Sequence, residues 1–192
     1  MMPVFGLIGA GNYDLAVLET LLRRLRPDLE KVVVRRCGND YRVTTTLTAR
    51  LQELSKLRAV GRLDKAIVVK DSHRAAPGRE LEKLREAIEG RDYPFPVEFA
   101  VAVRALESWL LVDDGALSTV AGERGAQRQF PAPDRSPEQF PNPKGRLSEL
   151  LAEAQIPYTE AVAIRIAELV SLERIEALCP SFTLFKRAAE HC

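Results

Sequence analysis

Apolar runs rich in valine and isoleucine alternate with helix-patterned segments through the first hundred residues, and this alternation constrains the fold most strongly. The apolar runs cover residues 4–8, 32–36, 66–70 and 98–103. Unbroken apolar runs are typical of strands buried on both faces, as in a parallel sheet covered by its crossover helices. The sequence therefore predicts an α/β fold with a four-stranded, mostly parallel, Rossmann-like sheet.

Leucines spaced three or four residues apart predict the helices that connect and follow these strands. The predicted helical segments are 15–25, 43–57, 77–88, 105–112, 144–154, 159–170, 172–178 and 182–189. Ser171 and Ser181 stand directly before two of them, so both are predicted to be N-caps.

A proline-rich segment separates the βα repeat from the helical C-terminal part. Residues 130–143 hold five of the chain's twelve prolines, a composition that predicts a loop or strap laid over the surface. We therefore expect an α/β domain at 1–125, a strap at 126–143 and a C-terminal helical cap at 144–192 packed on the same domain. A chain of 192 residues, 46% hydrophobic, is long enough for one such core.

The overall charge neither indicates nor excludes a nucleic-acid partner, because the chain has nearly equal numbers of basic and acidic residues, 28 and 27. Residues 1–74 carry 14 basic and 8 acidic residues, which fits either a phosphate-facing surface or scattered surface charge. The three cysteines, Cys37, Cys179 and Cys192, form no C-x-x-C pair, which argues against a zinc ribbon or disulfide framework. Together with the lack of a long apolar run, this predicts a cytoplasmic protein without a membrane partner.

Ionisable residues follow the third and fourth predicted strands, at the sheet edge where chemistry collects in open α/β folds. Asp71 ends the third strand and His73 lies two residues later, while Glu107 opens the helix after the fourth. Carboxylates can hold Mg²⁺ or Mn²⁺, and an imidazole ligand favours manganese. We expect Asp71, Glu107 and His73 to form a metal site and to act in catalysis. The alternatives are a loop cap for Asp71, a surface position for His73 and a helix-dipole contribution by Glu107.

A glycine turn follows the first strand. Gly9 and Gly11 would let the backbone approach a phosphate at a helix N-terminus. As a dinucleotide fingerprint the turn is incomplete, because Asp14 replaces the third small residue. Arg35 and Arg36 after the second strand would suit a 2′-phosphate, so NADP binding is one alternative; a tight turn with Asp14 capping the helix is another.

Basic residues flank the same sheet edge. Lys70 and Arg74 bracket the acid at the end of the third strand, and Lys144 follows Asn142 and Pro143 at the exit of the strap. We expect Lys70, Arg74 and Lys144 to contact phosphates, although Pro143 can also simply start a helix.

These pieces in this order resemble the bacterial proteins of domain of unknown function family 4276, which are similar to RloB-like and TOPRIM-like proteins. The family has a Val-Glu-Gly-like turn, an Asp-x-Asp-Arg strand end, a Glu-x-Trp helix, an Asn-Pro-Lys motif and a Pro-Ser-Phe helix. The corresponding segments here are residues 8–14, 69–74, 101–111, 142–144 and 180–185.

The resemblance implies a TOPRIM-like sheet and Mg²⁺-dependent phosphoryl transfer, as in nucleases. Asp71 takes the place of the first aspartate and Glu107 that of the helix glutamate. Two departures weaken the pattern: the turn glutamate falls on Ala10, and the second aspartate on His73.

The sequence thus predicts a TOPRIM-like, degenerate metal-dependent nuclease or phosphoryl-transfer protein that acts on nucleic acid. The departures at Ala10 and His73 favour an alternative, a catalytically inactive TOPRIM-like subunit of a complex, for which analogy suggests a partner ATPase. An NADP-binding protein is the third reading.

Overall fold

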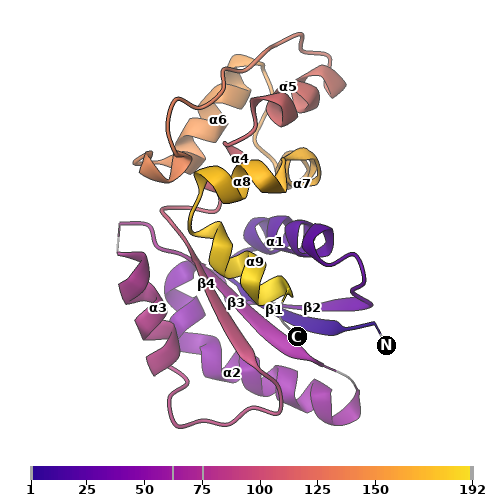
Figure 1. The fold of residues 1–192 in the computed structure, drawn as a ribbon, viewed down its shortest axis with the longest axis vertical. Coiled ribbons are helices and arrows are strands. Elements are labelled where there is room, and N and C mark those ends of the chain that lie inside the picture. The colour runs from indigo at the N-terminus through magenta and orange to yellow at the C-terminus, as the bar shows by residue number, and fades with distance from the viewer. Residues whose placement is uncertain (1, 62, 75, 191–192) are drawn as a thin grey trace.

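The structure, a computed structural model, describes residues 2–61, 63–74 and 76–190 and has an α/β fold (Figure 1). Within these residues four strands form one sheet in the order β2-β1-β3-β4, and every neighbouring pair is parallel. The strands are β1 (Val4–Gly9), β2 (Lys31–Arg36), β3 (Lys65–Asp71) and β4 (Val97–Ala102). This confirms the predicted parallel sheet flanked by helices.

The central strands β1 and β3 are buried on both faces, which explains their unbroken apolar sequences. Because side chains alternate along a strand, Leu7 and Ile67 belong to one core, and Ile8 and Val68 belong to a second core on the opposite face. The sheet therefore needs helices on both sides.

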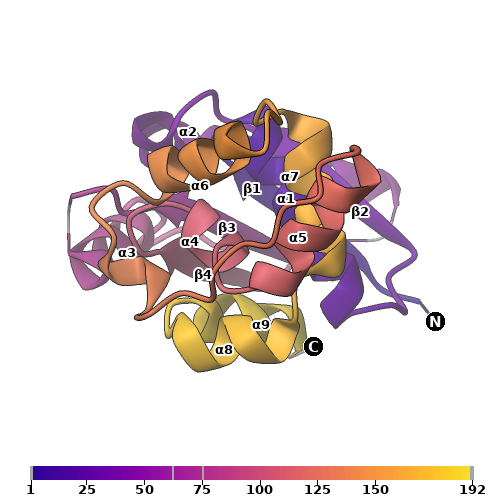
Figure 2. The same cartoon turned by 90° about the horizontal axis from the view of Figure 1, so that it is seen from above.

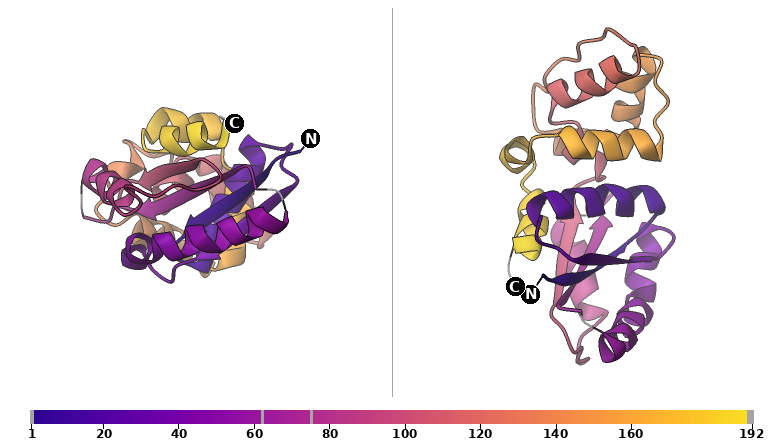
Figure 3. Two further views of the ribbon diagram at one scale, coloured as in Figure 1. Left: turned by 90° about the horizontal axis from the view of Figure 1, so that it is seen from below. Right: turned by 90° about the vertical axis from the view of Figure 1, so that its right-hand side faces the viewer.

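Helices cover both faces of the sheet (Figures 1 and 3). Helices α1 (Asn12–Leu25) and α9 (Phe182–Glu190) contribute to the core that contains Leu7, and α2 (Asp40–Val60) and α3 (Pro77–Glu86) to the core that contains Ile8. The last helix thus returns the chain to the sheet.

A layer of helices lies beyond the carboxyl ends of the strands, as the view from above shows (Figure 2). It consists of α4 (Glu107–Leu110), α5 (Asp114–Glu123), α6 (Pro143–Glu153), α7 (Glu160–Leu169) and α8 (Leu172–Leu178). Helix α7 packs against both α1 and α5, so the layer is fastened to the sheet domain. The layer also includes α5, which lies within the α/β domain predicted at 1–125. The domain boundaries predicted from the sequence stay predictions.

The helix predicted at 105–112 is shorter than expected. Only α4 forms, and a separate helix, α5, follows because the Asp113 side chain caps it by accepting from Ala116 N–H at 3.1 Å. The other carboxylate oxygen of Asp113 accepts from Ser171 N–H at 2.8 Å. This buried aspartate therefore joins two parts of the helical layer.

Before α6 the strap is irregular apart from a 3-10 turn, η1 (Pro137–Gln139), and it is fastened by Ser181. Glu138 accepts hydrogen bonds from the Ser181 backbone N–H and hydroxyl, and Trp109 Nε1 donates to the same hydroxyl at 2.9 Å. Ser181 was predicted to be an N-cap; its hydroxyl fixes the strap instead. Ser171 is an N-cap as predicted, since it accepts from Arg174 N–H.

Of the cysteines, Cys37 and Cys179 are buried free thiols, and Cys192 lies outside the described residues. Among the helices in the described ranges, none combines the length and apolar composition needed to cross a bilayer.

Candidate functional site

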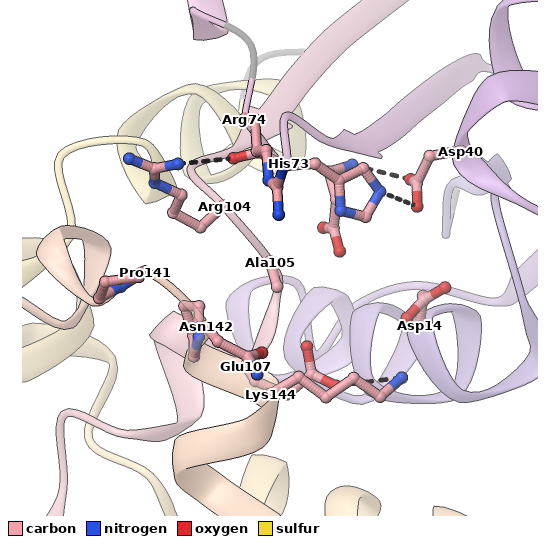
Figure 4. Close-up of a pocket in the computed structure, with 12 residues that line it drawn as sticks. Asp14, Asp40, His73, Arg74, Arg104, Ala105, Glu107, Pro141, Asn142 and Lys144 are labelled. Atoms are coloured by element: carbon pink, nitrogen blue, oxygen red, sulfur yellow. Dashed lines mark hydrogen bonds and ion pairs between the residues drawn. The ribbon is translucent and has the colours of Figure 1, made fainter.

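The loops after all four strands carry ionisable side chains to one edge of the sheet. The strand order reverses between β1 and β3, and in open α/β sheets ligands bind outside the strand ends at such a point. A pocket of about 390 Å³ lies there, which we call the acidic pocket (Figure 4). It is lined by Asp14, Asp40, Asp71, His73, Arg74, Arg104, Ala105, Glu107, Pro141, Asn142, Pro143 and Lys144.

Asp40, Asp71 and His73 form a compact group on one side of this pocket. The Asp71 N–H donates to Asp40 Oδ1 at 2.9 Å, and His73 Nε2 lies 2.8 Å from Asp40 Oδ2. Asp71 Oδ1 accepts from Leu106 N–H at 3.0 Å. One ligand atom from each of the three side chains lies within 4.8 Å of the others, close enough to share one ion.

The contact with Asp40 fixes the tautomer of His73. A carboxylate oxygen only accepts, so Nε2 must carry the proton in this contact. Neutral His73 therefore keeps a lone pair on Nδ1.

Two residues of this pocket have left-handed backbone conformations that non-glycine residues seldom adopt. His73 has φ 51° and Arg104 has φ 65°. The two loops hold each other, because His73 N–H donates to Arg104 O at 2.9 Å and Arg104 N–H donates to the buried Ser72 hydroxyl at 2.9 Å. Strained backbone held by its surroundings clusters at functional sites.

Glu107 faces this group from the other side of the pocket (Figure 4). Its side chain is buried, and Oε1 accepts from Tyr158 Oη at 3.2 Å and lies 3.6 Å from Lys144 Nζ. Burial, and then the neighbouring Glu107, raise the pKa of Tyr158, so this phenol stays protonated and donates. The Lys144 side chain is 59% exposed and is therefore able to move toward an incoming anion.

Burial and mutual repulsion raise the pKa values of three carboxyl groups. The pKa of Asp71 is raised well above its ordinary value by burial, and then by the charges of Asp40, Asp14 and Glu107. Burial also raises the pKa of Glu107, against the opposing charge of Lys144, and burial raises the pKa of Asp14. Acids that repel one another in this way attract a divalent cation.

Most of the residues predicted from the sequence come together in this pocket. Asp71, His73, Glu107, Arg74 and Lys144 all line it. The prediction that these side chains share one end of the sheet thereby finds support, although their roles stay predictions.

The structure corrects the expectation for the other three. The ammonium of Lys70 is buried, 2.5 Å from Glu80 and 3.0 Å from the Thr44 hydroxyl, so it stabilises the fold instead of facing a phosphate. Gly9 ends β1 and Gly11 precedes α1, and neither lines the acidic pocket. The Gly11 N–H donates to Asp14 Oδ2 at 3.0 Å, which leaves it no donor for an anion.

Sequence reasoning missed Asp40 and Arg104, and it considered Asp14 only as a helix cap or as a departure from the dinucleotide fingerprint. Asp40 opens α2 behind the N-cap Asn39, which accepts from Arg42 N–H at 3.0 Å. The prediction started this helix at residue 43, after the point where the acid lies. An Asn-Asp pair shortly after a buried strand was the signal that could have placed Asp40 at the strand edge.

No family model matches the chain, and neither a curated protein nor a solved structure matches it. The resemblance to the family of unknown function thus stays a prediction, and the argument for function rests on the geometry of the acidic pocket.

Proposed function

We propose that the protein is a divalent-metal-dependent phosphoryl-transfer protein that cleaves phosphodiester bonds of nucleic acid. The observation that carries the proposal is the convergence of Asp40, Asp71 and His73 within 4.8 Å of one another. Arg74, Arg104 and Lys144 line the same pocket and provide positive charge for a phosphate.

The donor set fits a divalent ion. Two carboxylates and a neutral imidazole suit manganese better than magnesium, which prefers oxygen ligands alone. Asp71, Asp40 and a ring nitrogen of His73 would hold the ion, which would take the place of the hydrogen bond between His73 and Asp40, with Asp14 and Glu107 adding negative charge nearby. An ion held there would neutralise phosphate charge and polarise a phosphate oxygen.

The remaining residues have roles that follow from charge and pKa. Lys144 and Arg104 would bind and orient the phosphate, since both line the acidic pocket. Burial raises the pKa of Glu107, which suits a group that takes and returns a proton. Tyr158 holds Glu107 in position through its hydroxyl.

The test combines metal binding with cleavage. We expect Mn²⁺ titration, followed by the paramagnetic resonance signal of free Mn²⁺, to reveal one site that Asp71→Asn abolishes. Asp71→Asn should also abolish Mn²⁺-dependent cleavage of single-stranded DNA, while Asp92→Asn, an exposed carboxylate before β4, should change neither. Cleavage that survives Asp71→Asn would overturn the proposal.

A second candidate is a catalytically inactive binding subunit, for instance beside an ATPase. One observation favours it. Lys144 Nζ lies 3.6 Å from Glu107, so the pocket already has a positive charge where an ion would otherwise supply one. Mn²⁺ binding without cleavage of DNA or RNA would favour this candidate.

The third reading, NADP binding, gains no such support. The Gly11 N–H is engaged with Asp14, whose carboxylate would repel a pyrophosphate, and Arg35 Nε pairs with Glu53 at 3.1 Å. We expect NADPH to leave the thermal unfolding temperature unchanged; a saturable rise of several degrees would contradict this.

A further inference from the structure

A second hollow adjoins the acidic pocket beneath the proline-rich strap. It has a volume of about 440 Å³, and we call it the strap hollow. Its lining comprises Asp134, Arg135, Phe140, Pro141, Asn142, Arg146 and Glu149. Pro141 and Asn142 line both cavities, so the strap hollow and the acidic pocket adjoin at these two residues.

Phe140 provides an aromatic surface in the strap hollow. Its ring is partly buried, and the Arg135 guanidinium lies over it at 5.4 Å from the centroid. Planar guanidinium and aromatic groups are the surfaces on which nucleobases stack in single-strand-binding proteins. The exposed Arg135 side chain can either move aside or itself form the stacking surface.

A cavity of about 290 Å³ with a more apolar lining adjoins the strap hollow. Phe140, Arg146 and Asp134 line both, and Leu111 and Leu150 form part of the inner wall. The hollow therefore combines an apolar wall and an aromatic ring with charged groups at its rim, a composition typical of sites for small planar ligands.

We propose that the strap hollow is a subsite for the nucleobase of a nucleotide whose phosphate lies in the acidic pocket. This inference rests on the proposed function and specifies its substrate. The substrate is a strand with an unpaired base next to the cleaved phosphate. A base fits better than an aliphatic group because its ring stacks on Phe140 or Arg135. Its polar edge meets Asp134 and Arg146 at the rim.

The first experiment isolates the base. Calorimetric titrations compare thymidine and deoxyadenosine 5′-monophosphates with 2-deoxyribose 5-phosphate, which lacks only the base, each with and without Mn²⁺. We expect the two nucleotides to bind about five- to tenfold more tightly than the sugar phosphate, the lower range for one stacked base. Equal affinities of all three ligands would overturn the subsite.

The second experiment assigns the gain to the strap hollow. Phe140→Leu, which keeps an apolar side chain, should remove most of the preference for the nucleotides and leave sugar-phosphate affinity unchanged. Tyr93→Leu is the matched control, since Tyr93 is also partly buried but precedes β4 at the opposite end of the sheet. A preference that survives Phe140→Leu would contradict the assignment.

A charge variant keeps the proposal testable even if Phe140→Leu fails to fold. Arg146→Gln should weaken nucleotide binding more than sugar-phosphate binding, whereas Arg128→Gln should do neither. The two arginines are matched, because each side chain is 44% exposed and paired with a glutamate of α6. Equal effects of the two variants would refute a role for Arg146 at the base.

The outcomes separate the subsite from the proposed function. If the wild-type protein does not bind Mn²⁺, the metal site is refuted. The ratio of nucleotide affinity to sugar-phosphate affinity tests the base subsite independently. If the protein binds Mn²⁺ and the sugar phosphate but does not prefer the nucleotides, the proposed function still stands and the base subsite in the strap hollow is refuted.

Discussion

His73 and Arg104 hold each other in a backbone conformation that neither would adopt alone. His73 N–H donates to Arg104 O at 2.9 Å, Arg104 Nη1 lies 3.4 Å from His73 O, and both residues have positive φ. The left-handed region costs a non-glycine residue roughly 1–2 kcal/mol. The arginine side chain is thus kept at the acidic pocket at an energetic cost, as expected of a group that contacts substrate.

This strain predicts opposite effects on stability and binding for Arg104→Gly. Glycine adopts positive φ freely, so we expect the free energy of unfolding to stay unchanged or to rise by up to about 1 kcal/mol. Phosphate affinity should fall because a cation is lost. The same substitution at Arg85, in the last turn of helix α3, should cost up to about 1 kcal/mol. Denaturant unfolding and phosphate titration check both; a clear loss of stability in Arg104→Gly would contradict the strain.

The acidic pocket also predicts a pH-dependent stability. Because the pKa of Asp71 is raised in the folded protein, the folded state holds that proton more tightly than the unfolded state. The resulting stabilisation is complete below the ordinary carboxyl pKa and is lost as the pH rises through the raised value. Without metal, Asp71→Asn should therefore match the wild type in acid and exceed it at neutral pH by about 0.5–2 kcal/mol.

Unfolding measured over a pH series decides this, with Asp92→Asn as the control that should follow the wild type throughout. Saturating Mn²⁺ should stabilise only the proteins that keep Asp71. A wild type whose stability rises steadily toward neutral pH, with Asp71→Asn below it, would refute the repulsion among these carboxylates.

Two lysines predicted to bind phosphate should behave differently. Lys70 and Glu80 form a buried pair, with side chains only 8% and 7% exposed, so Lys70→Met should cost about 3 kcal/mol. The loss falls at the lower end for such pairs because Lys83 also contacts Glu80 at 2.6 Å. Lys144→Met should change stability by less than about 0.5 kcal/mol but weaken phosphate binding. Near-equal stabilities of the two variants would show that Lys70 is not a structural residue.

These contrasts show what the sequence could and could not predict. Apolar runs located the strands because burial on both faces leaves a continuous pattern, and Asp71 was placed because it ends one of those runs. Lys70, its neighbour, was misassigned because nothing in the local sequence indicates that Glu80, ten residues later, packs against it. Asp40 was missed because a run of threonines obscured the start of its helix.

The strap depends on an interaction that the sequence could not indicate. The Ser181 hydroxyl joins Glu138 to Trp109, residues more than forty positions away. Ser181→Ala should therefore leave the buried Trp109 Nε1 without its partner, while Glu138 keeps only the Ser181 backbone N–H. We expect a loss of about 1–3 kcal/mol. Ser171→Ala, which removes an N-cap of α8, should cost only about 1 kcal/mol. Equal losses would contradict the role of Ser181 in fastening the strap.

The metal preference of the pocket should follow residue 73. His73 has φ 51°, a conformation that aspartate and asparagine tolerate better than most residues, so His73→Asp and His73→Asn both keep the backbone. His73→Asp replaces an imidazole nitrogen with a charged oxygen ligand. We expect it to raise affinity for Mg²⁺ relative to Mn²⁺ and to increase Mg²⁺-dependent cleavage. His73→Asn, which lacks the charge, should bind both ions more weakly than the wild type. Ala10→Glu, the companion reversion suggested by the family pattern, is a poor test because Ala10 is only 4% exposed and belongs to the core beneath α2.

Titrations of the wild type, His73→Asp and His73→Asn with Mg²⁺ and with Mn²⁺ measure these affinities. An unchanged ratio of Mg²⁺ to Mn²⁺ affinity in His73→Asp would exclude His73 as a ligand and leave it only as the partner of Asp40.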